Sequence, residues 1–313
     1  IENTPSRFRN DHTIMLYHIL SLANIGRFEE ALELINNITH PGEKGIASHM
    51  VYSLQKNHSK SKLALKQMMK VIEMEEFPDA WINNNLEFKH LRQEPKTILS
   101  IKPEEKLITV IMTTHKWNEY LPTAVNSVLN QTYENIQFII VDDHSTEDDV
   151  KLYDSIMLDS RIERVRMENN VGTYACRNKG IELAKGEFVT FADSDDWVHP
   201  QKIELGLKKM EKENLDLLIG RFVRISESGN IWFNGNKLLQ FSLVGMLVRF
   251  SSMQKFKLCF DGRARFGADS EFLERAEVLL GPEKIQRTNN VELIALHHSD
   301  SLTGGGPNSI DWT

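Results

Sequence analysis

The chain contains few cysteines, no long hydrophobic run and no excess of basic residues. Two cysteines, Cys176 and Cys259, occur among 313 residues, so a disulfide scaffold is excluded and a reducing compartment is expected. No apolar run approaches the roughly 20 residues that cross a bilayer. Acidic residues outnumber basic residues by 44 to 37, for a formal net charge of -7. This balance argues against a nucleic acid partner, because nucleic acid binding needs a basic surface.

Glycine is missing where the common phosphate-binding loops need it. The first expected strand of the α/β region is followed by Thr113-Thr-His-Lys-Trp117. No Gly-x-Gly-x-x-Gly lies there, so a dinucleotide-binding domain is not expected. A Gly-Lys-Ser/Thr loop of the P-loop type does not occur either.

Residues 1–94 predict a small all-α domain of helical hairpins. Apolar residues recur at the i, i+3, i+4, i+7 spacing of a helix face over 16–23, 31–38 and 65–72. Residues 24–31 resemble the second half of a tetratricopeptide repeat, and a poorer copy follows about 33 residues later. This TPR-like region is expected to be either a docking module for a protein partner or a plain helical bundle that caps the rest of the chain.

Residues 107–313 predict an α/β domain, and the charged, proline-containing stretch 95–106 predicts the linker that precedes it. Strands and helices alternate along its first half, which is typical of a mostly parallel sheet with helices on both faces. The strands are expected at 107–112, 136–141, 161–167 and 187–192, and the helices at 119–130, 148–158 and 173–184. The carboxyl ends of such strands share one edge. The acids that end two of the strands, Asp142-Asp143 and Asp193/Asp195, are therefore expected to lie close together.

Three acids follow the last of these strands almost at once, in Phe188-Val-Thr-Phe-Ala-Asp193-Ser-Asp195-Asp196. Carboxylates at the end of a buried strand are costly unless a cation or hydrogen-bond donors meet them. The stretch therefore predicts a metal site that holds a phosphorylated ligand. The alternative is that Asp195 or Asp196 caps a helix that begins near Pro200, although three acids in four residues exceed what one cap needs.

Several ordered motifs resemble those of family 2 glycosyltransferases, which have the GT-A fold. The match covers residues 107–303 and is far more specific than any single short pattern. Asp193-Ser-Asp195 is similar to the DxD element of the family, and Gly267-Ala-Asp269 stands where the family has Glu-Asp, with Ala268 in place of Glu. The other motifs are Val110-Ile-Met-Thr-Thr-His115, Ser127-Val-Leu-Asn-Gln-Thr-Tyr133, Ile139-Ile-Val-Asp-Asp-His-Ser-Thr146, Asn170-Val-Gly-Thr-Tyr-Ala-Cys-Arg-Asn178 and the closing His298-Ser-Asp-Ser-Leu-Thr303.

The resemblance implies a metal-dependent, inverting transfer of a sugar from a UDP-sugar to a hydroxyl of a glycan or lipid-linked acceptor. Related proteins often build bacterial surface polysaccharides, so a cytoplasmic location is expected, which includes a peripheral place at the inner face of the membrane. By the same resemblance, Asp195 is the direct metal ligand, His298 is the second protein ligand, and Asp193 contacts the ribose directly or through the metal. Hard oxygen ligands suit Mn²⁺ or Mg²⁺, and the imidazole favours Mn²⁺.

The resemblance also assigns residues that bind the nucleotide sugar. Asp143 stands where the acid of the family accepts a hydrogen bond from uracil, and Thr113 offers backbone contacts. His115 replaces the common Tyr of the family as a stacking platform. Arg177 is expected to reach the base or a phosphate, because a forked donor suits phosphate. A surface salt bridge is the alternative for this residue.

Asp269 is the candidate general base. An inverting transfer needs a carboxylate that accepts the proton of the acceptor hydroxyl as its oxygen attacks the anomeric carbon. A helix is expected over 270–280, so the competing role for Asp269 is that of an N-cap. An asparagine would serve as a cap but not as a base.

Two other functions are compatible with parts of the pattern. A sugar-nucleotide pyrophosphorylase shares the general fold, but it needs a glycine-rich loop after the first strand, and residues 113–118 contain no glycine. A non-catalytic scaffold would combine partner-binding helices with an inert transferase-like domain. The intact acids argue against an inert domain.

Overall fold

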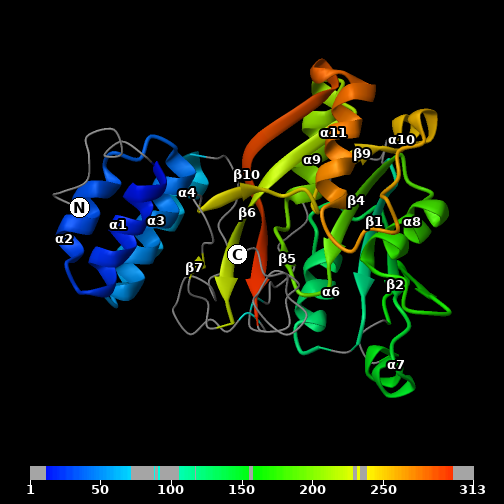
Figure 1. Ribbon diagram of the computed structural model, residues 1–313, viewed down its shortest axis with the longest axis horizontal. Coiled ribbons are helices and arrows are strands. Elements are labelled where there is room, and N and C mark those ends of the chain that lie inside the picture. Colours follow the sequence, from blue (N-terminus) through cyan, green and yellow to red (C-terminus); the bar gives the residue numbers. More distant parts are fainter. Residues whose placement is uncertain are drawn as a thin grey trace. The chain divides into compact units, whose positions relative to one another are not determined.

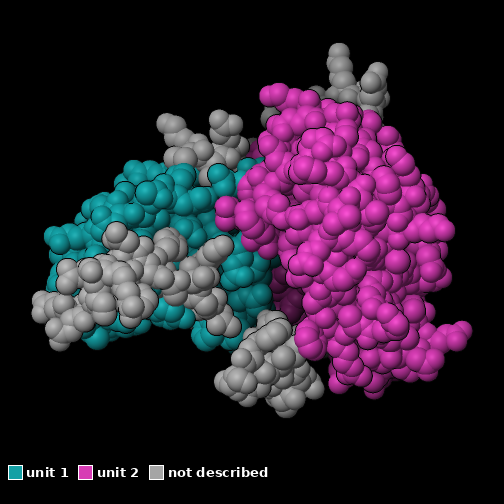
Figure 2. Space-filling model, turned by 45° about the horizontal axis from the view of Figure 1, so that its top comes forward, with its two compact units in different colours: residues 1–92, 222–240, 289–313 teal, residues 93–221, 241–288 magenta. Residues whose placement is uncertain are grey.

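The structure is a computed structural model, and it describes residues 12–71, 88, 91, 106–116, 118–154, 158–227, 231–232 and 238–298. The chain divides into two compact units, coloured separately in Figure 2. The first unit comprises residues 1–92, 222–240 and 289–313, and the second comprises residues 93–221 and 241–288. Nearly all of the expected linker at 95–106 and the segment 299–303 lie outside the described residues, and the domain boundaries expected from the sequence stay a prediction.

The described part of the first unit begins with helices, drawn in blue in Figure 1. They are α1 (His12–Asn24), α2 (Phe28–Ile35), α3 (Pro41–Leu54) and α4 (His58–Val71). Gly26 follows α1 with a φ of 80°, in the left-handed region that favours glycine. The apolar faces are buried as their spacing predicts, for example at Leu16, Ile19, Ala31 and Leu65. The expected helices are therefore confirmed, and the tetratricopeptide likeness stays a prediction.

A buried histidine makes the stability of these helices depend on pH. His49 on α3 is 3% exposed, and its Nδ1 lies 2.7 Å from the Ser61 hydroxyl of α4. Burial lowers the pKa of His49 to about 4. The unfolded chain, with a histidine pKa near 6.5, therefore binds a proton between about pH 6.5 and pH 4 that the folded chain does not. We expect the free energy of unfolding to fall by up to about 3 kcal/mol across this range.

Urea denaturation followed by circular dichroism at pH 7.5 and pH 4.5 measures this difference. His49→Gln removes the titrating group, so its own pH dependence should be smaller than that of the wild-type chain. His58→Gln is the matched control, because His58 is exposed at the start of α4. An equal pH dependence in the His49→Gln variant and the wild-type chain would contradict the assignment.

The parallel half of the sheet forms as the alternation predicts (Figure 1). Strands β3 (Ile162–Arg166), β2 (Ile136–Asp142), β1 (Ile108–Thr114) and β4 (Phe188–Asp193) lie side by side in that order and run parallel. Strands β1 and β2 are buried along their whole length, so their sequences are nearly continuous apolar runs rather than alternating ones. The connecting helices are α6 (Leu121–Leu129), α7 (Glu147–Asp154) and α8 (Thr173–Leu183).

An antiparallel extension continues the sheet beyond β4. Strand β9 (Leu247–Arg249) pairs antiparallel with both β4 and β6 (Leu217–Ser226). Strand β10 (Ile285–His297) and the short β5 (Trp197–Val198) follow, and β7 (Ile231–Trp232) and β8 (Leu239–Phe241) pair with β6. The remaining helices are α9 (Lys202–Lys212), α10 (Phe250–Phe256), α11 (Ala268–Leu280) and the 3-10 turn η3 (Pro282–Lys284). Among the helices of the described residues, none combines the length and apolarity needed to cross a membrane.

Candidate active site

The acids that end two strands lie at one edge of the sheet, as expected. In the register of the parallel strands, Thr113 of β1 is opposite Asp193 of β4, and Thr114 is opposite Asp142 of β2. The end of β1 therefore lies between the two acids. The Thr113 hydroxyl makes a hydrogen bond of 2.7 Å with the hydroxyl of Thr173, the first residue of α8, so Thr113 also ties this edge to α8.

The segment after the acids is held by two polar residues of the motif at 127–133, Ser127 and Gln131. The Ser127 hydroxyl accepts a hydrogen bond from the backbone N–H of Val198 at 3.0 Å. The buried Gln131 side chain donates to the carbonyl of His199 at 2.9 Å and accepts from the N–H of Ile203 at 3.2 Å. These bonds hold residues 198–203, which follow the acid cluster, against helix α6. Within that segment Trp197 is fully buried in the core.

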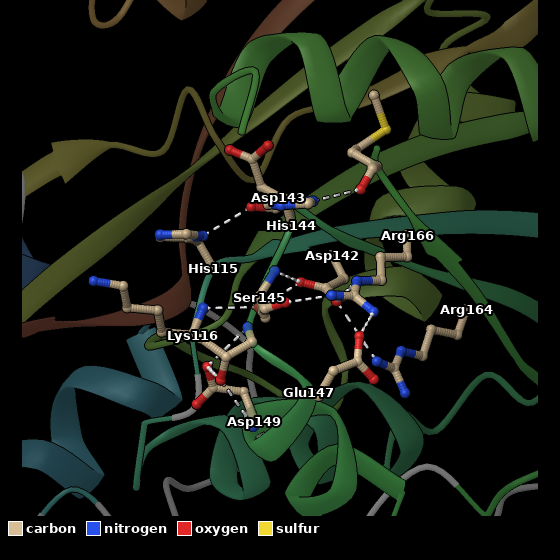
Figure 3. A network of polar contacts seen from close by, with 12 residues as sticks. His115, Lys116, Asp142, Asp143, His144, Ser145, Glu147, Asp149, Arg164 and Arg166 are labelled. Atoms are coloured by element: carbon tan, nitrogen blue, oxygen red, sulfur yellow. Dashed lines mark hydrogen bonds and ion pairs between the residues drawn. The ribbon is translucent and has the colours of Figure 1, made fainter. Parts of the chain in front are cut away.

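The neighbouring acids Asp142 and Asp143 have different surroundings (Figure 3). The fully buried Asp142 accepts hydrogen bonds from the backbone N–H and the hydroxyl of Ser145, and its second oxygen lies 3.5 Å from Arg164 and 3.8 Å from Arg166. Through these contacts Asp142 holds the turn after β2.

Asp143 points away from this turn, towards the residues that precede α8. Its two carboxylate oxygens accept the backbone N–H groups of Val171 at 2.7 Å and Gly172 at 2.9 Å. Gly172 has a φ of 88°, in the region that favours glycine. The contact of Asp143 with a uracil stays a prediction.

His115 lies beside Asp143 with an exposed ring. Its Nδ1 is 2.8 Å from the backbone oxygen of Asp143, and the side-chain nitrogen of Asn170 is 3.3 Å from both ring nitrogens. Figure 3 shows the ring directed at the Asp143 backbone. This arrangement orients the imidazole and leaves it accessible, which is compatible with the expected stacking platform, although no contact tests that role.

Arg177 is a buried residue of the site rather than a surface one. Its side chain is 3% exposed, and its Nη2 donates to Asp193 Oδ1 at 2.6 Å. The guanidinium lies over the rings of Tyr174 and Phe260, at 5.3 and 5.6 Å from their centroids. Within the described part of the chain its Nε has no hydrogen-bond partner. The surface salt bridge weighed for Arg177 is therefore wrong, because its guanidinium is buried beside the partly exposed Asp193.

Negative charge is concentrated around Asp193. Burial raises the pKa of Asp193 above its usual range, and the carboxylates of Asp195 and Asp269 raise it further, against the opposing effect of the Arg177 guanidinium. A site with this excess of carboxylates favours a cation, and carboxylate oxygens suit Mg²⁺ or Mn²⁺. The donor chemistry of Asp193 and Asp195 thus fits the expected metal.

The remaining expected ligand, His298, follows the end of β10 and is half-buried. It belongs to the first unit, whereas Asp193 and Asp195 belong to the second. Among the described residues, no group of three or more His, Cys, Asp or Glu side chains has the geometry to hold a metal ion. Joint ligation by Asp195 and His298 stays a prediction.

Asp269 lies in the first turn of α11 without capping it. The helix begins at Ala268, its N-cap is Gly267 with a φ of 78°, and no side chain makes a cap hydrogen bond. Asp269 Oδ1 instead accepts a hydrogen bond of 3.1 Å from the hydroxyl of Tyr174. The competing role of Asp269 as an N-cap is therefore wrong.

Sequence reasoning gave no role to Tyr174, Asn178 or Phe260. The Asn178 side chain donates to the Phe260 carbonyl at 2.8 Å and accepts from the Phe260 N–H at 2.9 Å, which ties α8 to the loop before α11. Tyr174 and Arg177 are three residues apart on one helix, so their shared face could be inferred. Their partners, 95 and 16 residues away along the chain, could not.

Comparison with known proteins places these features in a family. Residues 109–269, just over half of the chain, match the family model described as "Glycosyl transferase family 2". Glycosyltransferase GlyG of Streptococcus pneumoniae is 37% identical over 130 residues, which cover 41% of this chain and 43% of GlyG. The uncharacterized glycosyltransferase MJ1057 of Methanocaldococcus jannaschii is 35% identical over 134 residues, which cover 41% of this chain and 46% of the relative. The chain thus spans less than half the length of these curated relatives.

Solved structures show the same architecture. TarS of S. aureus, residues 1–349 in complex with UDP-GlcNAc, superimposes with a TM-score of 0.53 at 19% identity, covering 62% of this chain and 59% of that chain. A longer TarS structure gives a TM-score of 0.52 and covers 60% of this chain and 36% of that chain. At this identity the likeness shows the fold alone.

The mixed α/β sheet that ends in these acids is a GT-A fold, the class expected from the sequence. The chain belongs to glycosyl transferase family 2.

Proposed function

We propose that this chain is a metal-dependent, inverting glycosyltransferase that moves a sugar from a UDP-sugar to a hydroxyl of a glycan or lipid-linked acceptor. Membership of family 2 supports transfer rather than pyrophosphorylase chemistry. The structural neighbour TarS binds UDP-GlcNAc, which supports a UDP-sugar donor. The observation that carries the proposal is the cluster at the end of β4, where Arg177 holds Asp193 and the charges of Asp195 and Asp269 act on the same carboxylate.

The residues of the cluster divide the reaction between them. Asp269 accepts the proton of the acceptor hydroxyl while its oxygen attacks the anomeric carbon. Arg177 is further proposed to reach the base or a phosphate of the nucleotide, because a forked donor suits phosphate. Asp143, Thr113 and His115, which lie next to the start of α8, are proposed to bind the nucleotide.

A metal would be held by Asp195, with Asp193 nearby and His298 as the second protein ligand. When bound, Mn²⁺ or Mg²⁺ would stabilise the negative charge that develops on the leaving diphosphate. The protein itself orients the acids for this role through the hydrogen bond of Arg177 to Asp193 and through the bonds that hold residues 198–203 against α6.

The wider setting of the reaction is part of the same proposal. It comprises bacterial surface polysaccharide synthesis, a cytoplasmic location that includes the inner face of the membrane, and a protein partner for the TPR-like helices.

A panel of UDP-sugars tests the proposal. Purified chain is incubated with UDP-glucose, UDP-galactose, UDP-GlcNAc or UDP-GalNAc, with Mn²⁺, Mg²⁺ or EDTA, and released UDP is measured. We expect release from one sugar above the others and only with a metal. Calorimetry with UDP and Mn²⁺ accompanies the panel, because an inert scaffold would show no metal-dependent binding. The proposed function would be overturned if the chain released UDP from none of these sugars and showed no metal-dependent binding of UDP.

A further inference from the structure

One face of helix α8 contacts two different acids of the candidate active site. Tyr174 and Arg177 are three residues apart, so their side chains share that face. Arg177 donates to Asp193, in the DxD element, at 2.6 Å. Tyr174 donates to Asp269, the candidate base, at 3.1 Å. In the proposed reaction, the contact with Asp193 lies where the sugar donor binds, and the contact with Asp269 lies at the group that accepts the proton.

We propose that Tyr174 is a positioning residue for the general base, whose hydroxyl holds one oxygen of the Asp269 carboxylate and leaves the other to take the proton of the acceptor. This inference rests on the proposed function. Within the described part of the chain, the Tyr174 hydroxyl is the one side-chain group that donates to Asp269. Helix α11 does not fix the carboxylate through a cap.

The tyrosine stays a donor under all working conditions. Burial, followed by the neighbouring Asp269 charge, raises the pKa of Tyr174 to about 12. The hydroxyl therefore keeps its proton over the pH range in which an enzyme of this kind operates. A carboxylate that receives a hydrogen bond on one oxygen is held in one orientation, which is the requirement for a base that must meet a hydroxyl at a defined angle.

The Tyr174 ring is itself fixed by packing. It is 6% exposed and stacks on Phe260 with ring centroids 5.6 Å apart and an interplanar angle of 27°. Phe260 in turn stacks on Phe272 of α11 at 4.8 Å, and Asn178 holds the Phe260 backbone. A side chain locked in this way delivers its hydroxyl with little loss of conformational entropy, as expected of a group that supports a catalytic residue.

The variant Tyr174→Phe removes the hydroxyl and keeps the ring. With the UDP-sugar that the panel identifies, we expect kcat to fall roughly 10- to 100-fold, the usual range for a group that orients a functional residue. KM for the donor should stay within about twofold, because the nucleotide contacts are unchanged. Tyr133→Phe is the matched control, since Tyr133 is also buried and donates one hydrogen bond, to the Lys106 carbonyl at 2.7 Å, away from the acids. Its kcat should equal that of the wild-type chain.

A double variant shows whether Tyr174 acts through Asp269. In an Asp269→Asn background the base is already lost, so adding Tyr174→Phe should lower kcat by less than about twofold further. Multiplicative effects of the two substitutions would overturn the inference. So would a Tyr174→Phe variant as active as Tyr133→Phe, and in that case the proposed function would stand. A wild-type chain that neither releases UDP from any sugar nor binds UDP with Mn²⁺ would overturn the proposed function and this inference together.

Discussion

Asp269→Asn is expected to lower the turnover number for sugar transfer by roughly 10²- to 10⁴-fold, the range attributed to a general base. The substitution keeps the shape of the side chain and an oxygen that can accept the hydrogen bond of Tyr174, but it removes the group that takes the proton. Since Gly267 rather than Asp269 caps α11, the melting temperature should change little. Affinity for UDP should also be retained. Steady-state kinetics and thermal denaturation of the same preparation measure these effects.

The control for this prediction is Glu274→Gln, the same loss of one carboxylate on the same helix. Glu274 is exposed and lies five residues beyond Asp269. Its substitution should therefore leave turnover unchanged. Turnover of the Asp269→Asn variant within about threefold of the wild-type chain would remove Asp269 from the role of base. A reduced turnover accompanied by an equal loss of UDP affinity would instead assign Asp269 to donor binding.

Asp195→Ala is expected to abolish the metal-dependent part of UDP binding and to lower kcat/KM by about 10³-fold. A bound cation is expected to stabilise the charge on a leaving diphosphate by several kcal/mol, and about 1.4 kcal/mol corresponds to each factor of ten. Asp195 follows β4 by two residues, where burial and neighbouring carboxylates already raise the pKa of Asp193. Calorimetry with UDP in the presence and absence of Mn²⁺ separates metal-dependent from metal-independent affinity.

Asp148→Ala is the control for the loss of one carboxylate. Asp148 lies in the same unit, on α7, with a side chain that is 92% exposed, so both metal-dependent binding and kcat/KM should match the wild-type chain. If Asp195→Ala left the effect of Mn²⁺ on UDP affinity intact, the metal would have to be assigned to other residues.

The sequence predicts the parallel half of the fold well, because β1, β2 and β4 are largely apolar runs of six or seven residues and the helices between them are long enough to show a helical period. Strands β1, β2 and β4 each begin and end within two residues of their expected bounds. The antiparallel extension was not predicted, and neither were its long strands β6 and β10, of 10 and 13 residues. Its other strands β7, β8 and β9 have only two or three residues each. Strands of that length show no alternation, and their place depends on the neighbours with which they pair.

The candidate site could be predicted in its residue types and not in its contacts. The motifs indicate Asp193 and Asp269 as candidate functional residues, but nothing local indicates that Arg177 is buried or that Tyr174 binds an acid 95 residues away. The adjacent pair Asp142-Asp143 shows the same limit. The two acids have different partners because successive side chains along an extended chain point in opposite directions. Which of the two side chains faces the site depends on how the strand is placed in the sheet.

Helix α8 also limits how this scaffold can be redesigned. The Asn178 amide makes hydrogen bonds to both the N–H and the C=O of Phe260. A loop grafted from another transferase must therefore place its own backbone N–H and C=O where they can make the same two bonds. A transplanted loop one residue longer between Phe260 and Asp269 would shift Asp269 relative to Tyr174 while the nucleotide side stayed intact. Such a chimera would still bind UDP but would release it from the UDP-sugar slowly or not at all. The length of this loop must therefore be controlled when acceptor preference is engineered.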